Sequence, residues 1–570
     1  MPDTPPLRRT AGLLVPVFAL RHAADLGIGD TRAVHAAVDF CADLRLEVLQ
    51  LLPIHETVGD HSPYNPISAR ALAPAYLELT PEAVPGLTRD ALEAAAPAAW
   101  LAQLRAGPVK HNSVHALKLQ ILLAAHRSFC AAPPDAAAAE FQQFREANED
   151  WLRPYTLFRL LIREYEGNPD WAGWRPEHQT LAAAEAWFAR HPDQAQLARV
   201  REGLAFIQWI AWRQWTAVHE HARTKGVRLM GEMSYGVGRC SVDVWAHPDL
   251  FDFEWYVGTG PIAYFDTNKD SERWGQNWGL PPYRWENHRS TGFAWLRGRV
   301  AGERQFFDIC RLDHLRGYFR AHMFPWPGGV VHTEFATLTP EQAKLRTGGR
   351  LPRYVPGPDE DPVTARMNEL QGRELIALIE QAAGGMKLFA ELMGDMPDYM
   401  RRALDDLELA NLTFPQMERN ADRTLRPRET FRPLSLATYA THDHAPIAAV
   451  YTGLLAAAAQ DPGGTAATDL RELLSFAGWR GEPPATFTDD LHAALVRALF
   501  DTPCELAVLL SSDLLGIPQR FNLPGTYGAG TWAERLEFPL PEFRTHGVFA
   551  KRIDRVRVLV TETGRAGRPQ

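Results

Sequence analysis

An arginine and an aspartate stand two residues apart, directly after a short apolar run. Arg311 and Asp313 follow the segment 306–309 (FFDI). On a strand, positions i and i+2 share a face, so both side chains are expected to point the same way. A neighbouring guanidinium favours the ionised form of a carboxyl group, and an ionised carboxylate is a possible nucleophile. Asp313 is therefore a candidate nucleophile, although arginine–aspartate pairs are also common in purely structural roles.

Two further carboxylates follow short apolar runs in the same way. Glu391 comes after 386–390 (MKLFA), and Asp443 comes after 437–441 (ATYAT). Two carboxylates that flank a glycosidic bond cleave it, one attacking as the ion and the other donating a proton. Arg311 is expected to keep Asp313 ionised, and the apolar neighbours of Glu391 are expected to raise its pKa, as a proton donor requires. Asp443 has a second interpretation, as a turn former at the end of a strand.

The composition is that of an ordinary globular protein. Of the 570 residues, 46% are hydrophobic and 23% are charged, which excludes a disordered chain or a fibre. The formal net charge is -9, and no long run of lysine or arginine occurs. Nucleic acid is therefore not expected as a partner. No stretch is long and apolar enough to span a membrane, so no membrane partner is expected either.

The cysteines and histidines give no reason to expect a cofactor or a metal. The five cysteines are scattered and form no CxxC pair, and no Cys/His spacing typical of zinc is evident. His442, Asp443 and His444 are consecutive on a predicted strand, so they cannot all face one ion. We therefore predict no metal, no cofactor and a reduced, cytoplasmic setting.

Short apolar runs alternate with helical patterns along the chain, which predicts an α/β fold, a (β/α)8 TIM barrel without a separate C-terminal β-domain. The predicted strands are 13–20, 47–52, 227–230, 307–312, 387–392, 411–414 and 436–439, with an eighth at 517–521. The run 11–20 follows Arg8 and Arg9 and so also resembles a short signal peptide. We favour the strand, because no convincing small-residue cleavage site follows.

The uneven spacing of the predicted strands indicates one elaborated barrel, residues 1–570, with three insertions. Residues 85–214 are rich in Ala, Leu, Arg, Glu and Gln at helical spacing, which predicts a mostly helical insertion between strands 2 and 3. Residues 323–366 are rich in Pro and Gly and are predicted as a loop-rich insertion after strand 4. Residues 453–506 are predicted as a third insertion, after strand 7.

The segments around the three carboxylates resemble the amylomaltases, the 4-alpha-glucanotransferases of glycoside hydrolase family 77. The family nucleophile segment reads approximately VRIDHFRG, and residues 310–317 read CRLDHLRG. The acid/base segment reads approximately AEDLG, and residues 390–394 read AELMG. The third carboxylate lies in THDNDT, and residues 441–446 read THDHAP. The resemblance therefore places all three family carboxylates in this chain.

Other segments extend the resemblance over nearly the whole chain. Residues 27–30 (GIGD), 62–64 (SPY), 244–248 (VWAHP), 278–285 (WGLPPYRW) and 520–526 (RFNLPGT) are similar to family signatures, in the same order. Any one match would be weak, but many ordered matches at predicted barrel edges form a strong signal.

The resemblance implies a retaining double displacement. Asp313 would attack the anomeric carbon of an α-1,4-glucan while Glu391 protonates the departing glucan. Glu391 would then deprotonate the 4-hydroxyl of an acceptor sugar. The implied donors are maltooligosaccharides, starch or glycogen fragments, and the implied acceptors are glucose or maltooligosaccharides. The implied substrate-binding residues, beside the catalytic Asp443, are Arg311, His442, Tyr64, Ser62, Trp278, Glu232, Asn522, Tyr264 and Phe265.

Several residues depart from the family pattern. Glu232 stands where the family has an aspartate, His61 replaces an aspartate before the SPY motif, and Ala263 replaces an aspartate before the aromatic pair. Residues 444–446 (HAP) replace the family NDT, and Leu392–Met393 replace Asp-Leu. The residues expected to contact the sugars therefore differ from the family pattern, whereas the three catalytic carboxylates are retained. An α-glucan hydrolase, or a non-catalytic glucan-binding barrel, stays as an alternative function.

Overall fold

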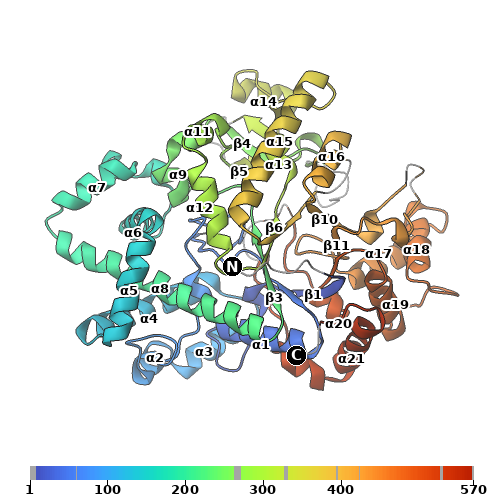
Figure 1. The fold of residues 1–570 in the computed structure, drawn as a ribbon, viewed down its shortest axis with the longest axis horizontal. Helices are drawn as coiled ribbons and strands as arrows, with labels where there is room; N and C mark the ends of the chain where they lie inside the picture. The colour runs from blue at the N-terminus through green and yellow to red at the C-terminus, as the bar shows by residue number, and fades with distance from the viewer. Residues whose placement is uncertain are drawn as a thin grey trace.

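The centre of the molecule is a closed barrel of eight parallel strands. The computed structural model describes residues 8–59, 61–261, 271–325, 332–392, 396–420, 422, 424–524, 526 and 530–567. The strands run around the barrel in the order β1-β12-β11-β10-β9-β6-β3-β2. Strands β1, β3, β6, β10 and β11 are labelled near the centre of Figure 1. They are β1 (Thr10–Leu14), β2 (Val48–Gln50), β3 (Arg228–Met233), β6 (Ile309–Leu312), β9 (Lys387–Ala390), β10 (Ala410–Thr413), β11 (Ser435–Ala437) and β12 (Leu506–Leu510). The predicted fold class, a (β/α)8 barrel, is confirmed.

Two of the predicted strands need correction. The first strand is Thr10–Leu14, and part of the predicted run 13–20 is instead a short 3-10 helix, Val17–Ala19, after Pro16. The eighth strand is not 517–521 but Leu506–Leu510. The sequence LAVLL is buried along its whole length and runs directly into helix α20 (Ser511–Leu515). A continuous apolar run shows no alternation, so periodicity could not separate this strand from a buried helix.

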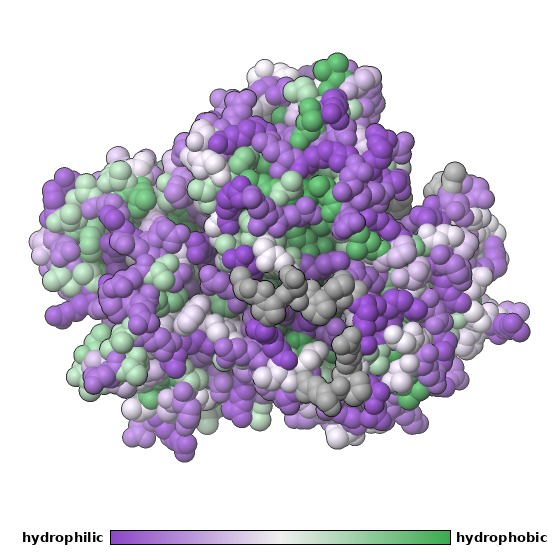
Figure 2. Space-filling view, viewed as in Figure 1, coloured by the Kyte–Doolittle hydropathy of each residue, from purple (hydrophilic) through white to green (hydrophobic). Residues whose placement is uncertain are grey.

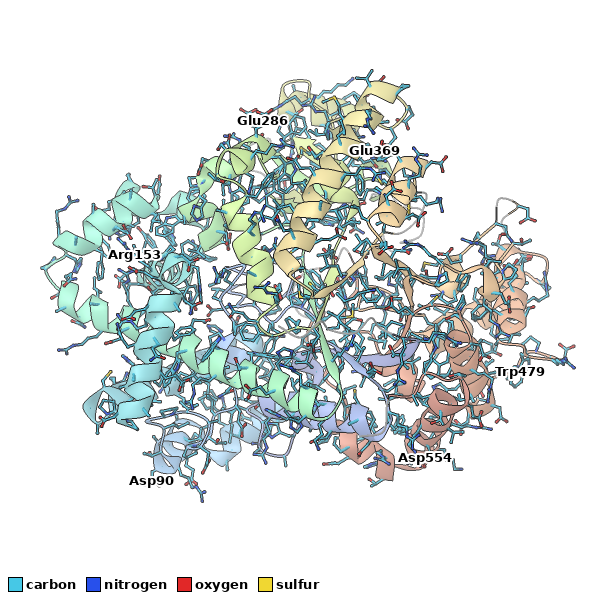
Figure 3. All side chains as sticks on the ribbon, in the orientation of Figure 1. Asp90, Arg153, Glu286, Glu369, Trp479 and Asp554 are labelled. Atoms are coloured by element: carbon cyan, nitrogen blue, oxygen red, sulfur yellow. The ribbon has the colours of Figure 1, made fainter. Side chains whose placement is uncertain are left out.

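Helices surround the barrel. Asp90 of α2 and Asp554 of α21 mark two points on their outer edge (Figure 3). Besides α20 and the helices described below, the structure contains α1 (Thr31–Asp43), α9 (Val242–Ala246), α10 (Ser271–Trp274), α11 (Trp285–Ser290), α12 (Ala294–Glu303), α13 (Arg316–Phe319), α15 (Pro362–Ala383), α16 (Asp398–Asp406) and α21 (Gly547–Glu562). Among the residues that the structure describes, none of the helices is long and apolar enough to cross a membrane.

The segment between β2 and β3 is a layered group of helices, seen as the lower left of Figure 1. It contains α2 (Arg89–Ala95), α3 (Ala98–Arg105), α4 (His111–Ala131), α5 (Asp135–Ala147), α6 (Glu149–Glu164), α7 (Leu181–Arg190) and α8 (Gln194–Thr224). Helix α8 extends past the predicted boundary at 214 and ends just before β3. Similarly, α17 (Ile447–Gln460), α18 (Thr465–Phe476) and α19 (Asp489–Phe500) separate β11 from β12.

Residues 323–366, predicted as loop, contain regular structure. Strand β7 (Ala321–Pro325), helix α14 (Pro340–Thr347) and strand β8 (Arg353–Val355) lie there. β7 and β8 join β4 (Trp255–Thr259) and β5 (Gln276–Leu280) in an antiparallel sheet of order β5-β4-β7-β8. Short strands whose partners lie far away in the sequence leave little local signal, so the sequence pattern did not reveal these elements. In the view of Figure 2, most of the surface of the molecule is hydrophilic, and hydrophobic residues gather below the lobe that contains α14 and α15.

A buried arginine joins the first and last strands of the barrel. Arg565 is 0% exposed. Its guanidinium donates to the carbonyl oxygens of Thr10 at 2.8 Å, Thr502 at 2.7 Å and Cys504 at 2.9 Å, and its Nε donates to that of Phe500 at 2.6 Å. These carbonyls flank the start of the β1–β12 seam. One side chain therefore satisfies backbone acceptors from the first residue of β1 and from the segment that leads into β12.

We expect Arg565→Met to destabilise the fold by about 3 kcal/mol or more, because it leaves several buried carbonyl groups without donors. Denaturant unfolding followed by tryptophan fluorescence measures the effect. Arg557→Met is the matched control, since Arg557 is exposed on α21, the helix that precedes Arg565. Equal unfolding midpoints for the two variants would show that the seam does not depend on Arg565.

Candidate active site

Three neighbouring strands, β3, β6 and β9, bring Glu232, Asp313 and Glu391 together at the carboxyl end of the barrel, where enzymes of this fold carry their active sites. Glu232 on β3 pairs in register with Arg311 on β6. Leu312 on β6 pairs with Ala390 on β9. Asp313 directly follows Leu312, and Glu391 directly follows Ala390. The parallel register therefore places Asp313 and Glu391 side by side at the same level of the barrel.

The Arg311 guanidinium lies among carboxylates from all three strands. It is 1% exposed, and its Nη2 lies 2.8 Å from Oε1 of Glu391. Its Nη1 lies 3.2 Å from Oδ1 of Asp313 and also contacts Oε1 of Glu232. The sequence predicted a pair with Asp313 alone. The structure instead shows one buried cation shared by three anions, which raises the pKa of Arg311 despite its burial.

Asp313 and Glu391 form a coupled pair, and the proton does not lie where the sequence predicted. Burial and the charge of Glu391 raise the pKa of Asp313 to about 7. Against the effect of burial, Arg311 and the backbone N–H of His314, at 2.8 Å, lower the pKa of Glu391. The prediction was wrong because it considered only the apolar neighbours of Glu391 along the chain. The two carboxyl groups also hydrogen-bond to each other, an interaction that raises the pKa of Asp313 and lowers that of Glu391, so a proton on the pair is favoured on Asp313.

Asp443 stays ionised. It lies in the loop after β11, with its side chain 30% exposed, and its Oδ2 is 3.0 Å from Nε2 of His442. Asn522 donates to Oδ1 at 2.7 Å, and Arg520 donates to the Asp443 carbonyl at 2.9 Å. Although burial opposes it, His442, together with the more distant His444 and Arg311, holds the pKa of Asp443 well below its ordinary value. Asp443 is thus a fixed anion facing the pair.

Tyr64 connects the two halves of this cluster. Its hydroxyl donates to Glu232 and lies 3.2 Å from Nδ1 of His442. Its ring stacks on His442, with 4.9 Å between the ring centroids. Ser62 accepts a hydrogen bond from the Tyr64 backbone N–H at 3.3 Å, so in this structure it shapes the turn that carries Tyr64.

Trp278 lies at the rim of the site, on β5 of the antiparallel sheet. Its half-buried ring meets His314 edge to face, with centroids 4.7 Å apart. The sheet therefore reaches the residues that follow β6. The predicted aromatic pair Tyr264 and Phe265, and Ala263 before it, lie outside the described residues.

Sequence reasoning missed Trp532. This residue has a left-handed backbone, with φ 59°, which is uncommon for a residue other than glycine. Its ring centroid is 5.7 Å from that of Tyr64 and 5.6 Å from that of His442. Nε2 of His111 lies 2.8 Å from the backbone carbonyl oxygen of Trp532. Residues with an uncommon backbone conformation cluster at functional sites, but only the fold brings Trp532 to Tyr64 and His442.

Comparison with known proteins identifies the family of the chain. A model of the 4-alpha-glucanotransferase family matches residues 15–540. The chain is 25% identical over 562 residues to a 4-alpha-glucanotransferase of Chlamydia pneumoniae, covering 96% of this chain and 94% of that protein. It is 31% identical over 335 residues to a 4-alpha-glucanotransferase of Oryza sativa subsp. japonica, covering 56% of this chain but only 32% of that longer protein.

A solved structure shows the same fold over the whole chain. The amylomaltase from Streptococcus agalactiae in complex with acarbose has a TM-score of 0.73 and 20% identity, and the match covers 98% of this chain and 100% of that one. The family resemblance expected from the sequence is confirmed by the family match, which spans most of the chain. The chain therefore belongs to glycoside hydrolase family 77, the 4-alpha-glucanotransferases, which act on α-1,4-glucans.

Proposed function

We propose that the chain transfers α-1,4-glucan segments by a retaining double displacement, with Asp313 as nucleophile and Glu391 as acid and base. The observation that carries this proposal is the direct contact of the two carboxyl groups on adjacent strands. Inverting enzymes hold their carboxyl groups about 6.5–9.5 Å apart, to leave room for a water molecule, whereas retaining enzymes hold them closer. A pair in contact favours the retaining reaction, with the sugar separating the two groups as it binds.

The shared proton supplies the acid for the first step. Glu391 gives it to the glycosidic oxygen while Asp313, now ionised, forms a bond to the anomeric carbon. The charge of the pair is unchanged, because one carboxyl group gains what the other loses. Arg311 contacts both groups and stabilises the negative charge in either position. In the second step, Glu391 takes the proton of the acceptor 4-hydroxyl and Asp313 leaves as a carboxylate.

Asp443 and His442 bind hydroxyl groups of the distorted sugar in this scheme. Asp443 is ionised before the sugar arrives, and Asn522 and Arg520 fix its position. Hydrogen bonds that sugar hydroxyls donate to a fixed anion strengthen as positive charge develops on the sugar ring, so they lower the barrier more than they improve ground-state binding.

Glu232 serves the site indirectly. It is 1% exposed, and its Oε1 is occupied by both Arg311 and Tyr64. Its extra methylene, compared with the family aspartate, brings the carboxylate to these two side chains. We infer that Glu232 positions Arg311 and Tyr64 rather than contacting a sugar directly.

The finer assignments rest on the family resemblance. We propose maltooligosaccharides, starch or glycogen fragments as donors, and glucose or maltooligosaccharides as acceptors, in a cytoplasmic setting. The solved neighbour that binds acarbose supports an oligosaccharide ligand. The division into one elaborated barrel, with insertions at 85–214, 323–366 and 453–506, is likewise a proposal. Trp278 is proposed as a sugar platform at the rim.

Incubation with maltotriose tests the overall reaction. We expect a ladder of longer oligosaccharides together with glucose, because an acceptor hydroxyl takes the glucan segment from Asp313. Chromatography of the products measures this. Glucose and maltose without longer products would indicate a hydrolase.

We expect Asp313→Asn to lower kcat on maltotriose by about 10⁴-fold or more. Asp398→Asn, which changes an exposed aspartate on α16, is the control and should keep full activity.

The variant Glu391→Gln distinguishes the role of the acid and base from that of the nucleophile. With maltotriose, we expect kcat to fall by about 10²- to 10⁴-fold, since the leaving oxygen receives no proton. With α-maltotriosyl fluoride, whose leaving group needs no proton, we expect Glu391→Gln to form and accumulate a covalent adduct. Mass spectrometry of the intact protein detects the adduct. If Asp313→Asn accumulated the same adduct, Asp313 would not be the nucleophile.

The shared proton predicts an alkaline limit to activity. The pair holds one proton below the raised pKa of Asp313, about 7, and loses it above. We therefore expect kcat/KM to fall as the pH rises through about 7, while circular dichroism shows the protein still folded. Glu232→Gln removes an anion from Arg311, so Arg311 should stabilise the ionised pair more strongly and shift this limb to lower pH. An unchanged limb in Glu232→Gln would contradict the indirect role of Glu232.

A further inference from the structure

Two helices of the segment between β2 and β3 present a nitrogen, a sulfur and an oxygen donor to one point. His126 and Cys130 lie one turn apart on α4, and Glu202 faces them from α8. The donor atoms of all three lie within 4.8 Å of one another. We propose that His126, Cys130 and Glu202 form a zinc site that joins α4 to α8, separate from the glucan site.

The donor spacing is close to what zinc requires. Nε2 of His126 lies 3.2 Å from Sγ of Cys130 and 4.0 Å from Oε2 of Glu202. Tetrahedral zinc with ordinary bond lengths separates a nitrogen and a sulfur ligand by about 3.6 Å, and a nitrogen and an oxygen ligand by about 3.4 Å. Movements of roughly half an ångström therefore convert the observed arrangement into a coordination shell. Cys130 is exposed and the Glu202 side chain is 37% exposed, so both are free to make them.

His126 is already fixed in place. It is 5% exposed, and its ring packs against Phe206 with 5.3 Å between centroids. Gly203, next to Glu202 on α8, makes room for the ring, since a Cβ there would lie 3.1 Å from Nδ1 of His126 and 2.9 Å from Leu123. Because Gly203 has no side chain, the His126 ring fits against α8, and Nε2 of His126 faces Cys130 and Glu202. A preformed ligand reduces the entropy lost on metal binding.

A third helix orients the carboxylate. Nη1 of Arg145 on α5 lies 3.3 Å from Oε1 of Glu202, which leaves Oε2 toward His126. Outer contacts of this kind orient the ligands of metal sites. Arg145 places a positive charge near the ion, and the charges of Glu202 and the Cys130 thiolate offset it.

The donor set defines the class of ion. Thiolate and imidazole bind zinc and similar transition metals, whereas magnesium and calcium require oxygen ligands. On binding, the Cys130 thiol loses its proton to solvent and the metal takes its place, with water filling the fourth position. The sequence prediction of no metal considered spacing along the chain and could not find Glu202, which the packing of α8 supplies.

Cobalt titration of the untagged, metal-free protein tests the site. We expect one Co²⁺ per chain, with a thiolate-to-cobalt band in the near ultraviolet and the visible bands of tetrahedral cobalt, all displaced by Zn²⁺. In Cys130→Ser the near-ultraviolet band should disappear, and Zn²⁺ affinity should fall by about 10- to 100-fold or more. Cys240→Ser, the half-buried cysteine outside the cluster, is the matched control and should keep both.

Thermal unfolding gives a second, independent measurement. Zn²⁺ should raise the melting temperature of the wild type, and raise it less or not at all in Cys130→Ser and Glu202→Gln. Both variants should keep wild-type transfer on maltotriose, so this test does not depend on the proposed catalytic roles. Absence of a stoichiometric cobalt complex, or a band that survives Cys130→Ser, would overturn the proposal.

Discussion

The chemistry of this barrel depends on one buried cation. Arg311 lies on β6 between β3 and β9, and its guanidinium contacts Glu232, Asp313 and Glu391. Three carboxylates this close would otherwise repel one another, and their burial would force protons onto them. Arg311 lets the cluster keep most of its negative charge at neutral pH. The barrel register fixes this arrangement, because the three strands are hydrogen-bonded neighbours.

The distribution of protons follows from the same contacts. Asp313 and Glu391 are the closest carboxyl groups, and the backbone N–H of His314 favours the ionised form of Glu391 only. A proton on this pair is therefore favoured on Asp313 rather than on Glu391. Asp443 belongs to a different electrostatic environment, since His442 and Asn522 surround it. Two carboxyl environments, one sharing a proton and one always ionised, meet the needs of a reaction that alternates between acid and base.

The additions to the barrel support the site from outside. The antiparallel sheet places Trp278 against His314, whose N–H binds Glu391. The segment around 520–532 supplies Arg520, Asn522 and the strained Trp532, which pack around Asp443, His442 and Tyr64. Residues far from Asp313 in the sequence therefore hold the side chains that we propose to bind the sugar. Changes in these segments can alter the glucan that is bound without altering the carboxylate chemistry.

The sequence alone determined the fold class, seven of the eight barrel strands in outline, and the family. The apolar runs 307–312 and 387–392 are local signals, and the carboxylates that follow them are recognisable by their segments. The sequence did not determine which strand closes the barrel, because Leu506–Leu510 has no alternating pattern. It also could not decide the protonation of Asp313 and Glu391, the indirect role inferred for Glu232, or the proximity of Trp532 to Tyr64. Each of these depends on distances between residues remote in the chain, and electrostatic and packing energies act through those distances. Only the tertiary structure decides them.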